Sequence, residues 1–126
     1  MKVNELWELP FISQELEDGV QFDVYGMDII ISFIYVQKSN IKVRAGIKFD
    51  SVLCHMHTSE CFTKNLFNAY DTLVEIKDSE WLEALKTLNG ISFLHWKPSH
   101  YAIYFDSVGL YQFIATGYQI LVEEVI

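Results

Sequence analysis

The sequence predicts an α+β domain built mainly on an antiparallel sheet of five to seven strands, with one or two helices packed on it. Segments with apolar residues at alternate positions recur along the chain, as in half-buried strands. Short turn signals separate these segments and leave no room for the crossovers that a parallel sheet needs. One stretch of helical periodicity follows residue 78. Strands that follow one another in sequence are therefore expected to be antiparallel neighbours.

Length and composition indicate one domain over residues 1–126. Hydrophobic residues make up 51% of the chain, which is enough for a single sizeable core. Aromatic residues make up 15% and supply large buried areas in a sheet. We find no repeat and no Gly/Ser or Pro tract that would mark a linker.

Residues 20–25 and 29–36 are predicted to form the first long strands. The turn signal at residues 17–19 precedes alternation over residues 20–25, which is typical of a half-buried strand. Gly26 and Met27 then predict a tight turn or a bulge. The nearly continuous apolar run at residues 29–36 makes this segment the best candidate for a central strand.

Strict alternation makes residues 41–49 the clearest strand of the sequence. The apolar residues expected to face inward are Ile41, Val43, Ile47 and Phe49. The cations expected on the opposite face are Lys42, Arg44 and Lys48. In an acidic chain such cations usually pair with carboxylates on neighbouring strands, and the alternative is contact with an acidic partner or an anionic ligand.

The segment after residue 51 combines cysteine, histidine and methionine. The apolar phase changes there, so a turn or bulge is expected, with Cys54 and Met56 inward and His55 and His57 together on the surface. Thiolate and imidazole are ligands for zinc or copper, but a strand points Cys54 away from the two histidines. The second cysteine, Cys61, completes no CxxC motif, and no HExxH motif occurs. We therefore expect free thiols, no metal site and no cofactor.

One helix and one hairpin are predicted in the second half. Residues 62–76 fit either a short helix or an irregular strand. Asp78 or Ser79 then offers an N-cap, and Asn89-Gly90 a helix end, around an apolar stripe made of Trp81, Leu82, Leu85 and Leu88. Residues 101–105 and 110–115 predict a hairpin, Thr116-Gly117 a break, and residues 118–122 a last strand.

The stretch HYAIYFDSVGLYQFIA, residues 100–115, resembles C-terminal hairpins of small bacterial proteins that include immunity proteins of polymorphic toxin systems. The resemblance implies a small, acidic, cytosolic domain that blocks a toxin by occupying its active site or an adjacent surface. It brings no functional residues.

Charge points toward a binding role. Seventeen acidic residues against nine Lys and Arg give a net charge of −8, which disfavours nucleic acid and favours a basic protein partner. Acidic segments with aromatic residues nearby suit such a partner, because charge speeds the encounter and aromatic side chains anchor it. The residues expected to take part in binding are Glu15, Glu17, Asp18, His95, Trp96 and His100.

No residue is predicted to be catalytic. His95 and His100 flank a loop at residues 96–99, but no GxSxG elbow, P-loop or dinucleotide fingerprint accompanies them. We expect a noncatalytic binding protein. The alternatives are a small-molecule binding or regulatory domain with an aromatic-lined pocket, and a hydrolytic or metal-dependent enzyme that uses His55, His57, His95 or His100.

Cysteine use and hydropathy bear on location. Two cysteines are too few for a secreted disulfide framework, and acidic residues interrupt the N-terminal segment before any apolar run reaches signal-peptide length. No apolar stretch approaches about 18 residues, the length that a membrane span needs. We expect a bacterial, cytoplasmic protein without a membrane partner, and the sequence makes no prediction of an oligomeric state.

Overall fold

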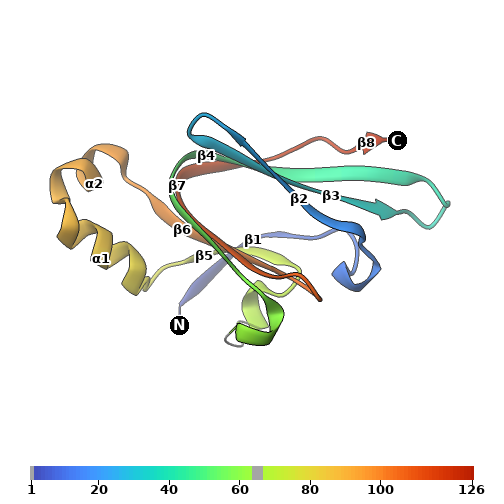
Figure 1. Cartoon of the computed structure of the whole chain (residues 1–126), viewed down its shortest axis with the longest axis horizontal. Helices are drawn as coiled ribbons and strands as arrows, with labels where there is room; N and C mark the ends of the chain where they lie inside the picture. Colours follow the sequence, from blue (N-terminus) through green and yellow to red (C-terminus); the bar gives the residue numbers. More distant parts are fainter. Residues whose placement is uncertain (1, 64–66) are drawn as a thin grey trace.

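A computed structural model describes residues 2–63 and 67–126 and shows one large antiparallel sheet with a pair of helices beyond one end of it (Figure 1). The predicted α+β class is confirmed. The strands are β1 (Val3–Glu8), β2 (Glu17–Tyr25), β3 (Asp28–Val36), β4 (Lys42–Thr58), β5 (Thr72–Ile76), β6 (Ser99–Phe105), β7 (Gly109–Ile120) and β8 (Glu124–Val125). The helices are α1 (Glu80–Leu88) and α2 (Gly90–Trp96), and short 3-10 turns are η1 (Ser13–Glu15), η2 (Glu60–Phe62) and η3 (Phe67–Ala69).

The sheet consists of two meanders joined side by side. Its strand order is β1-β5-β6-β7-β4-β3-β2, and the short β8 pairs with the beginning of β4. Within the meanders β2-β3-β4 and β5-β6-β7, strands adjacent in sequence pair antiparallel, as predicted. The pairs β4 with β7 and β1 with β5 join strands that are distant in sequence, and short-range turn signals do not predict them.

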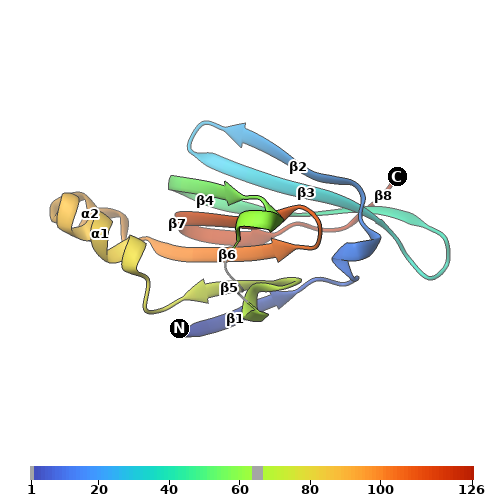
Figure 2. The same ribbon diagram turned by 60° about the horizontal axis from the view of Figure 1, so that its bottom comes forward.

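Figure 2 shows the strands in order from β2 at one edge to β1 at the other. The sheet curls, because aromatic rings from strands that are not neighbours in this order meet across its concave face. The ring of Trp7 in β1 lies 6.5 Å from that of Phe33 in β3, and Phe33 lies 5.4 Å from Phe105 in β6. The largest fully buried apolar side chains are Ile31, Phe33, Ile47, Phe49, Leu73, Ile103, Phe105, Ile114 and Phe113. All but Ile114 belong to the concave-face cluster, so the main core lies inside the curl.

Strand β3 lies inside the sheet, as predicted for residues 29–36, with β4 on one side and β2 on the other. It lies next to the edge strand β2, and its buried residues alternate with half-buried ones. Ile29, Ile31 and Phe33 face the core, whereas Ile30 and Ile34 face the convex side. A continuous apolar run therefore marks a strand with one buried face here, because the convex side receives only partial cover from the C-terminal segment.

Strand β4 confirms the clearest prediction with one correction. Val43, Ile47 and Phe49 are buried, and Phe49 stacks on Phe113 with ring centroids 4.0 Å apart. Ile41 was expected to face inward, but it precedes the strand and is exposed. Ile41 lies in the turn before β4, where its carbonyl accepts a hydrogen bond from the Gln37 N–H over 2.8 Å. The Ile41 side chain therefore stays at the surface.

Irregularity near residue 51 in β4 changes the phase, as predicted, but the strand continues to Thr58. Its register with β7 shifts between Val52 and Cys54, so a further residue is accommodated there. The expectation that Cys54 and Met56 lie in the core was wrong, because this shift turns Met56 to the other face, where it is 43% exposed. Both cysteines are free thiols.

Helix α1 matches its predicted N-terminus, because the Ser79 side chain accepts a hydrogen bond from the Leu82 N–H over 3.0 Å. α1 ends at Asn89, as predicted. The Asn89 side chain also caps the N-terminus of α2, a helix that was not predicted. Neither helix contains a buried residue, and Leu88 of the predicted apolar stripe is exposed. The ambiguous residues 62–76 contain the last residue of η2 and all of η3 and β5, and residues 64–66 lie outside the described ranges.

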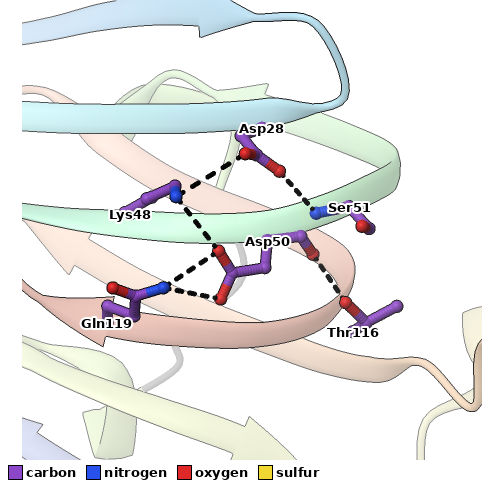
Figure 3. A network of polar contacts seen from close by, with 6 residues as sticks. All are labelled: Asp28, Lys48, Asp50, Ser51, Thr116 and Gln119. Atoms are coloured by element: carbon purple, nitrogen blue, oxygen red, sulfur yellow. Dashed lines mark hydrogen bonds and ion pairs between the residues drawn. The ribbon is translucent and has the colours of Figure 1, made fainter.

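The predicted C-terminal hairpin is formed by β6 and β7. Thr116 and Gly117 were expected to break the strand, but β7 passes through both to Ile120, and residues 118–122 form no separate strand. Pairing with β4 holds this stretch, because the Thr116 hydroxyl donates to the Asp50 carbonyl and the Gln119 amide contacts the Asp50 carboxylate (Figure 3). Contacts across the sheet therefore override the local glycine signal.

The C-terminal segment runs along the edge of the beginning of β4, where β8 pairs antiparallel with Val43 and Arg44. Leu121 donates its N–H to the Gly46 carbonyl over 3.0 Å, and its side chain lies over the glycine. A Cβ on Gly46 would come within 2.8 Å of the Ile31 carbonyl oxygen, so glycine is needed for this approach. The Tyr35 hydroxyl donates to the Glu123 carboxylate and anchors the same segment from the other side.

Candidate functional site

A helical hairpin, formed by α1 and α2, carries three aliphatic side chains that are largely exposed. Leu88, Ile91 and Leu94 are 82%, 85% and 67% exposed. Ile91 and Leu94 are three residues apart, so they lie on one face of α2, and Leu88 ends α1 beside it. We call these three residues the hairpin ridge. Both views place the helices beyond the end of the sheet (Figures 1 and 2).

The hairpin is joined to the sheet by a buried polar contact at His100. Ser79 Oγ lies 2.6 Å from His100 Nδ1, and His100 Nε2 lies 2.8 Å from Gln112 Oε1. Because Ser79 Oγ already accepts from Leu82, its proton is free to be donated to Nδ1, and Nε2–H donates to Gln112. This arrangement uses the neutral imidazole. Trp81 meets the ring edge-on at 5.3 Å.

Burial lowers the pKa of His100, and the hydrogen bond with Gln112 opposes that effect. The side chain is 5% exposed, so it has no surface to offer a partner. His95 lies on α2 and Trp96 ends it, so the loop predicted at residues 96–99 is shortened to Lys97 and Pro98, and Ser99 begins β6. Their nearness in sequence does not bring His95 and His100 together at one surface, because His100 is enclosed at the junction.

Glu15, Glu17 and Asp18 lie at the opposite end of the molecule from α1 and α2 (Figures 1 and 2). Glu17 pairs with Lys42 at 2.9 Å, while Glu15 and Asp18 are exposed. Thus the six residues predicted for binding form two separate groups. A role for either group in binding remains a prediction.

His55 and His57 share a face, as predicted, but this face is continuous with the core. The His57 ring stacks on Tyr111 at 4.4 Å, and the His55 ring lies 5.3 Å from Phe22. In the register of β4 with β7, they stand opposite Phe113 and Tyr111, whereas His100 contacts Gln112, on the other face of the sheet. Within residues 2–63 and 67–126, no group of three or more His, Cys, Asp or Glu side chains could hold a metal ion.

A groove of about 560 Å³ lies on the convex face between β2 and the C-terminal segment. Its lining includes charged, polar and aliphatic side chains, which pattern analysis of single strands did not identify. They come from Gln21, Asp23 and Tyr25 of β2, Ile30 and Ser32 of β3, Arg44, Ala45 and Gly46 of β4, and Leu121, Val122 and Glu124. The alternation of polar and apolar residues in β2 and β4 does indicate which side chains point outward. It does not indicate that these strands and the C-terminal segment lie side by side, because that depends on pairing between strands.

The three cations on the convex face of β4 differ in their partners. Lys42 pairs with Glu17, and Lys48 lies 3.6 Å from both Asp28 and Asp50 (Figure 3). Arg44, which lines the groove, has no ion pair or side-chain hydrogen bond with any residue in the described ranges. The prediction of carboxylate partners thus holds for the two lysines and not for Arg44.

Comparisons with protein-family models, with curated proteins and with solved structures give no match. No helix among the described residues has the length and apolar character needed to cross a bilayer.

Proposed function

We propose that this chain is a noncatalytic protein-binding domain whose helical hairpin docks on a basic partner protein. The observation that carries the proposal is the hairpin ridge, in which Leu88, Ile91 and Leu94 are each at least 67% exposed. Solvated aliphatic groups add no stability to the fold. When they gather on one projecting element, they are typical of a surface that is buried in a complex.

Charge favours a basic partner over a second copy of this chain or a membrane. A second copy would bring a net charge of −8 against another of −8, and an anionic lipid surface would also be repelled. Glu80 and Glu83 stand in the first turn of α1 and add negative charge to the hairpin that carries the ridge. The partner chemistry is therefore an apolar recess bordered by Lys or Arg side chains.

The acidic residues at the other end support the same partner without touching it. Glu15 and Asp18 are exposed and contribute to the field that draws a basic protein toward the molecule. Reversing both to Lys should slow association and leave dissociation almost unchanged. Variants on the ridge should instead speed dissociation, because contacts that are formed only in the docked complex set its lifetime.

A pair of matched variants tests the proposal. Ile91 and Phe62 are 85% and 84% exposed, and they lie on α2 and η2. Wild type, Ile91→Glu and Phe62→Glu are used as baits in cells of the source organism, the captured protein is identified and purified, and its binding is measured at increasing salt. Wild type and Phe62→Glu should bind one basic protein equally, with association slowed by salt, and Ile91→Glu should not.

Three results would contradict the proposal. Equal binding of that protein by Ile91→Glu would remove the ridge from the interface. A homodimer in solution that Ile91→Glu dissociates would identify a second copy as the occupant, and sedimentation with vesicles that Ile91→Glu abolishes would identify a lipid surface. Unfolding in urea provides the folding control, since replacing so exposed a side chain should change stability by less than about 0.5 kcal/mol.

The resemblance of the β6-β7 hairpin to those of immunity proteins supports a narrower form of the proposal, in which the partner is a toxin. Under this form, the captured protein has a toxic enzymatic activity. Stoichiometric addition of this chain should then suppress it, and addition of Ile91→Glu should not. Capture of a basic protein that has no such activity would leave the docking role and remove the inhibitory one.

A further inference from the structure

We propose that the groove on the convex face binds a small zwitterion, namely a short peptide or an amino acid with a free ammonium group and a free carboxylate. The site is distinct from the helical hairpin, and the proposal does not depend on the partner protein. Its volume of about 560 Å³ lies within the usual range for ligand pockets.

The carboxylate of the ligand is assigned to Arg44. The guanidinium of Arg44 reaches the groove and has no ion-pair partner among the described residues, although the chain has an excess of acids. Its neighbours on the same face, Lys42 and Lys48, are both paired. A planar guanidinium that is left open suits a carboxylate, because it can donate two parallel hydrogen bonds.

The ammonium group is assigned to the carboxylates that line the same groove. Asp23 on β2 and Glu124 on β8 form no ion pair with Arg44 or with any other described residue. Opposite charges thus face one groove without neutralising each other. A ligand that carries only a carboxylate would be repelled by the two acids, and one that carries only an amine would be repelled by Arg44. A ligand with both charges satisfies all three groups.

The remaining lining suits an apolar side chain and a peptide group. Tyr25 and Val122 are largely exposed at the groove, and Ile30 and Leu121 add further aliphatic surface. Ser32 lies on the strand between Asp23 and Arg44 in the sheet and offers a hydroxyl to a peptide carbonyl or N–H. Gly46 keeps the adjoining surface low, since a Cβ there would meet Leu121 at 3.2 Å.

The test is an NMR titration of the full chain with three ligands that share one dipeptide. They are alanyl-leucine, its N-acetyl derivative and its C-terminal amide. Alanyl-leucine should shift the amide signals of Gln21, Asp23, Arg44 and residues 121–124, and removal of either charge should weaken binding about tenfold, the expected effect of losing one charge-assisted contact. Arg44→Gln should weaken binding of alanyl-leucine by the same factor. It should not weaken binding of the amide, which lacks the carboxylate and is repelled by the guanidinium in the wild type.

Matched variants separate recognition from general charge effects. Lys42→Gln removes the same unit of charge two residues away on the same face and should change the dissociation constant less than twofold. Arg44→Lys keeps the charge without the planar fork and should give an intermediate affinity. The proposal is overturned if alanyl-leucine gives no shifts at millimolar concentration, if the three ligands bind equally, or if Arg44→Gln binds as wild type does.

Discussion

Ser79 Oγ and His100 Nδ1 lie 2.6 Å apart, and this contact joins the N-terminus of α1 to strand β6. The same hydroxyl oxygen caps the helix by accepting the Leu82 N–H. One side chain therefore orients the hairpin and satisfies a buried imidazole. Because the hairpin has no buried residue of its own, this junction is a principal means of setting its direction relative to the sheet.

Replacing Ser79 with Ala should destabilise the protein more than replacing Asn89 with Ala. Both side chains are helix N-caps, and loss of such a cap costs about 1 kcal/mol. Ser79→Ala also leaves the buried Nδ1 of His100 without a partner, which adds about 1 to 3 kcal/mol. Urea unfolding of the two variants measures the difference. Equal losses would show that the contact with His100 contributes nothing beyond the cap.

Stability should fall as pH is lowered through the range in which His100 titrates. Burial depresses the pKa of His100 in the folded protein, so the unfolded chain, with a His pKa of about 6.5, binds the proton more readily. The contribution of His100 is thus fully present above that pH, and it is lost as pH falls through the folded pKa. His100→Gln should reduce this pH dependence in urea unfolding. His95→Gln, at an exposed site, should retain it.

Gly46→Ala and Gly90→Ala should have opposite effects on stability. A methyl group at Gly46 meets the Ile31 carbonyl at 2.8 Å and Leu121 at 3.2 Å, so the strands must separate at a cost of about 1 to 3 kcal/mol. At Gly90, in the first turn of α2, nothing lies within 4 Å, and Ala should stabilise by about 0.4 to 1 kcal/mol. Thermal unfolding compares them, and destabilisation by both would contradict the role of space at residue 46.

Phe49→Ala should cost about 3 to 5 kcal/mol, whereas Lys48→Ala should cost at most about 1 kcal/mol. Phe49 is fully buried and stacks on Phe113, so truncation leaves a cavity between β4 and β7. Lys48 is adjacent in sequence but on the convex face, where its pairs with Asp28 and Asp50 are solvated. Denaturant unfolding measures both, and a small effect at Phe49 would contradict the assignment of the core.

The groove shows where prediction from sequence stops. The outward positions of Lys42, Arg44 and Lys48 follow from alternation alone, and the structure agrees. Alternation does not predict which of these cations pairs with a carboxylate. Glu17 and Asp28 come close to β4 through the pairing of β2, β3 and β4, and Glu124 lies about eighty residues away in sequence from Arg44, which it faces. The open guanidinium of Arg44 became visible only with these strands in register.

Local periodicity by itself determined the strands β2, β3 and β4, the hairpin of β6 and β7, and the buried face of β4. The capping signal at Asp78 or Ser79 determined where α1 begins. These features depend on residues within one turn or one strand, so the sequence expresses them directly. Only the tertiary structure decided that β4 pairs with β7, that His100 is enclosed and that Leu88 is exposed. An apolar residue at helical spacing is buried only if another element covers it, and no strand or loop among the described residues covers the hairpin ridge. Cover of this kind depends on long-range pairing, which local periodicity does not encode.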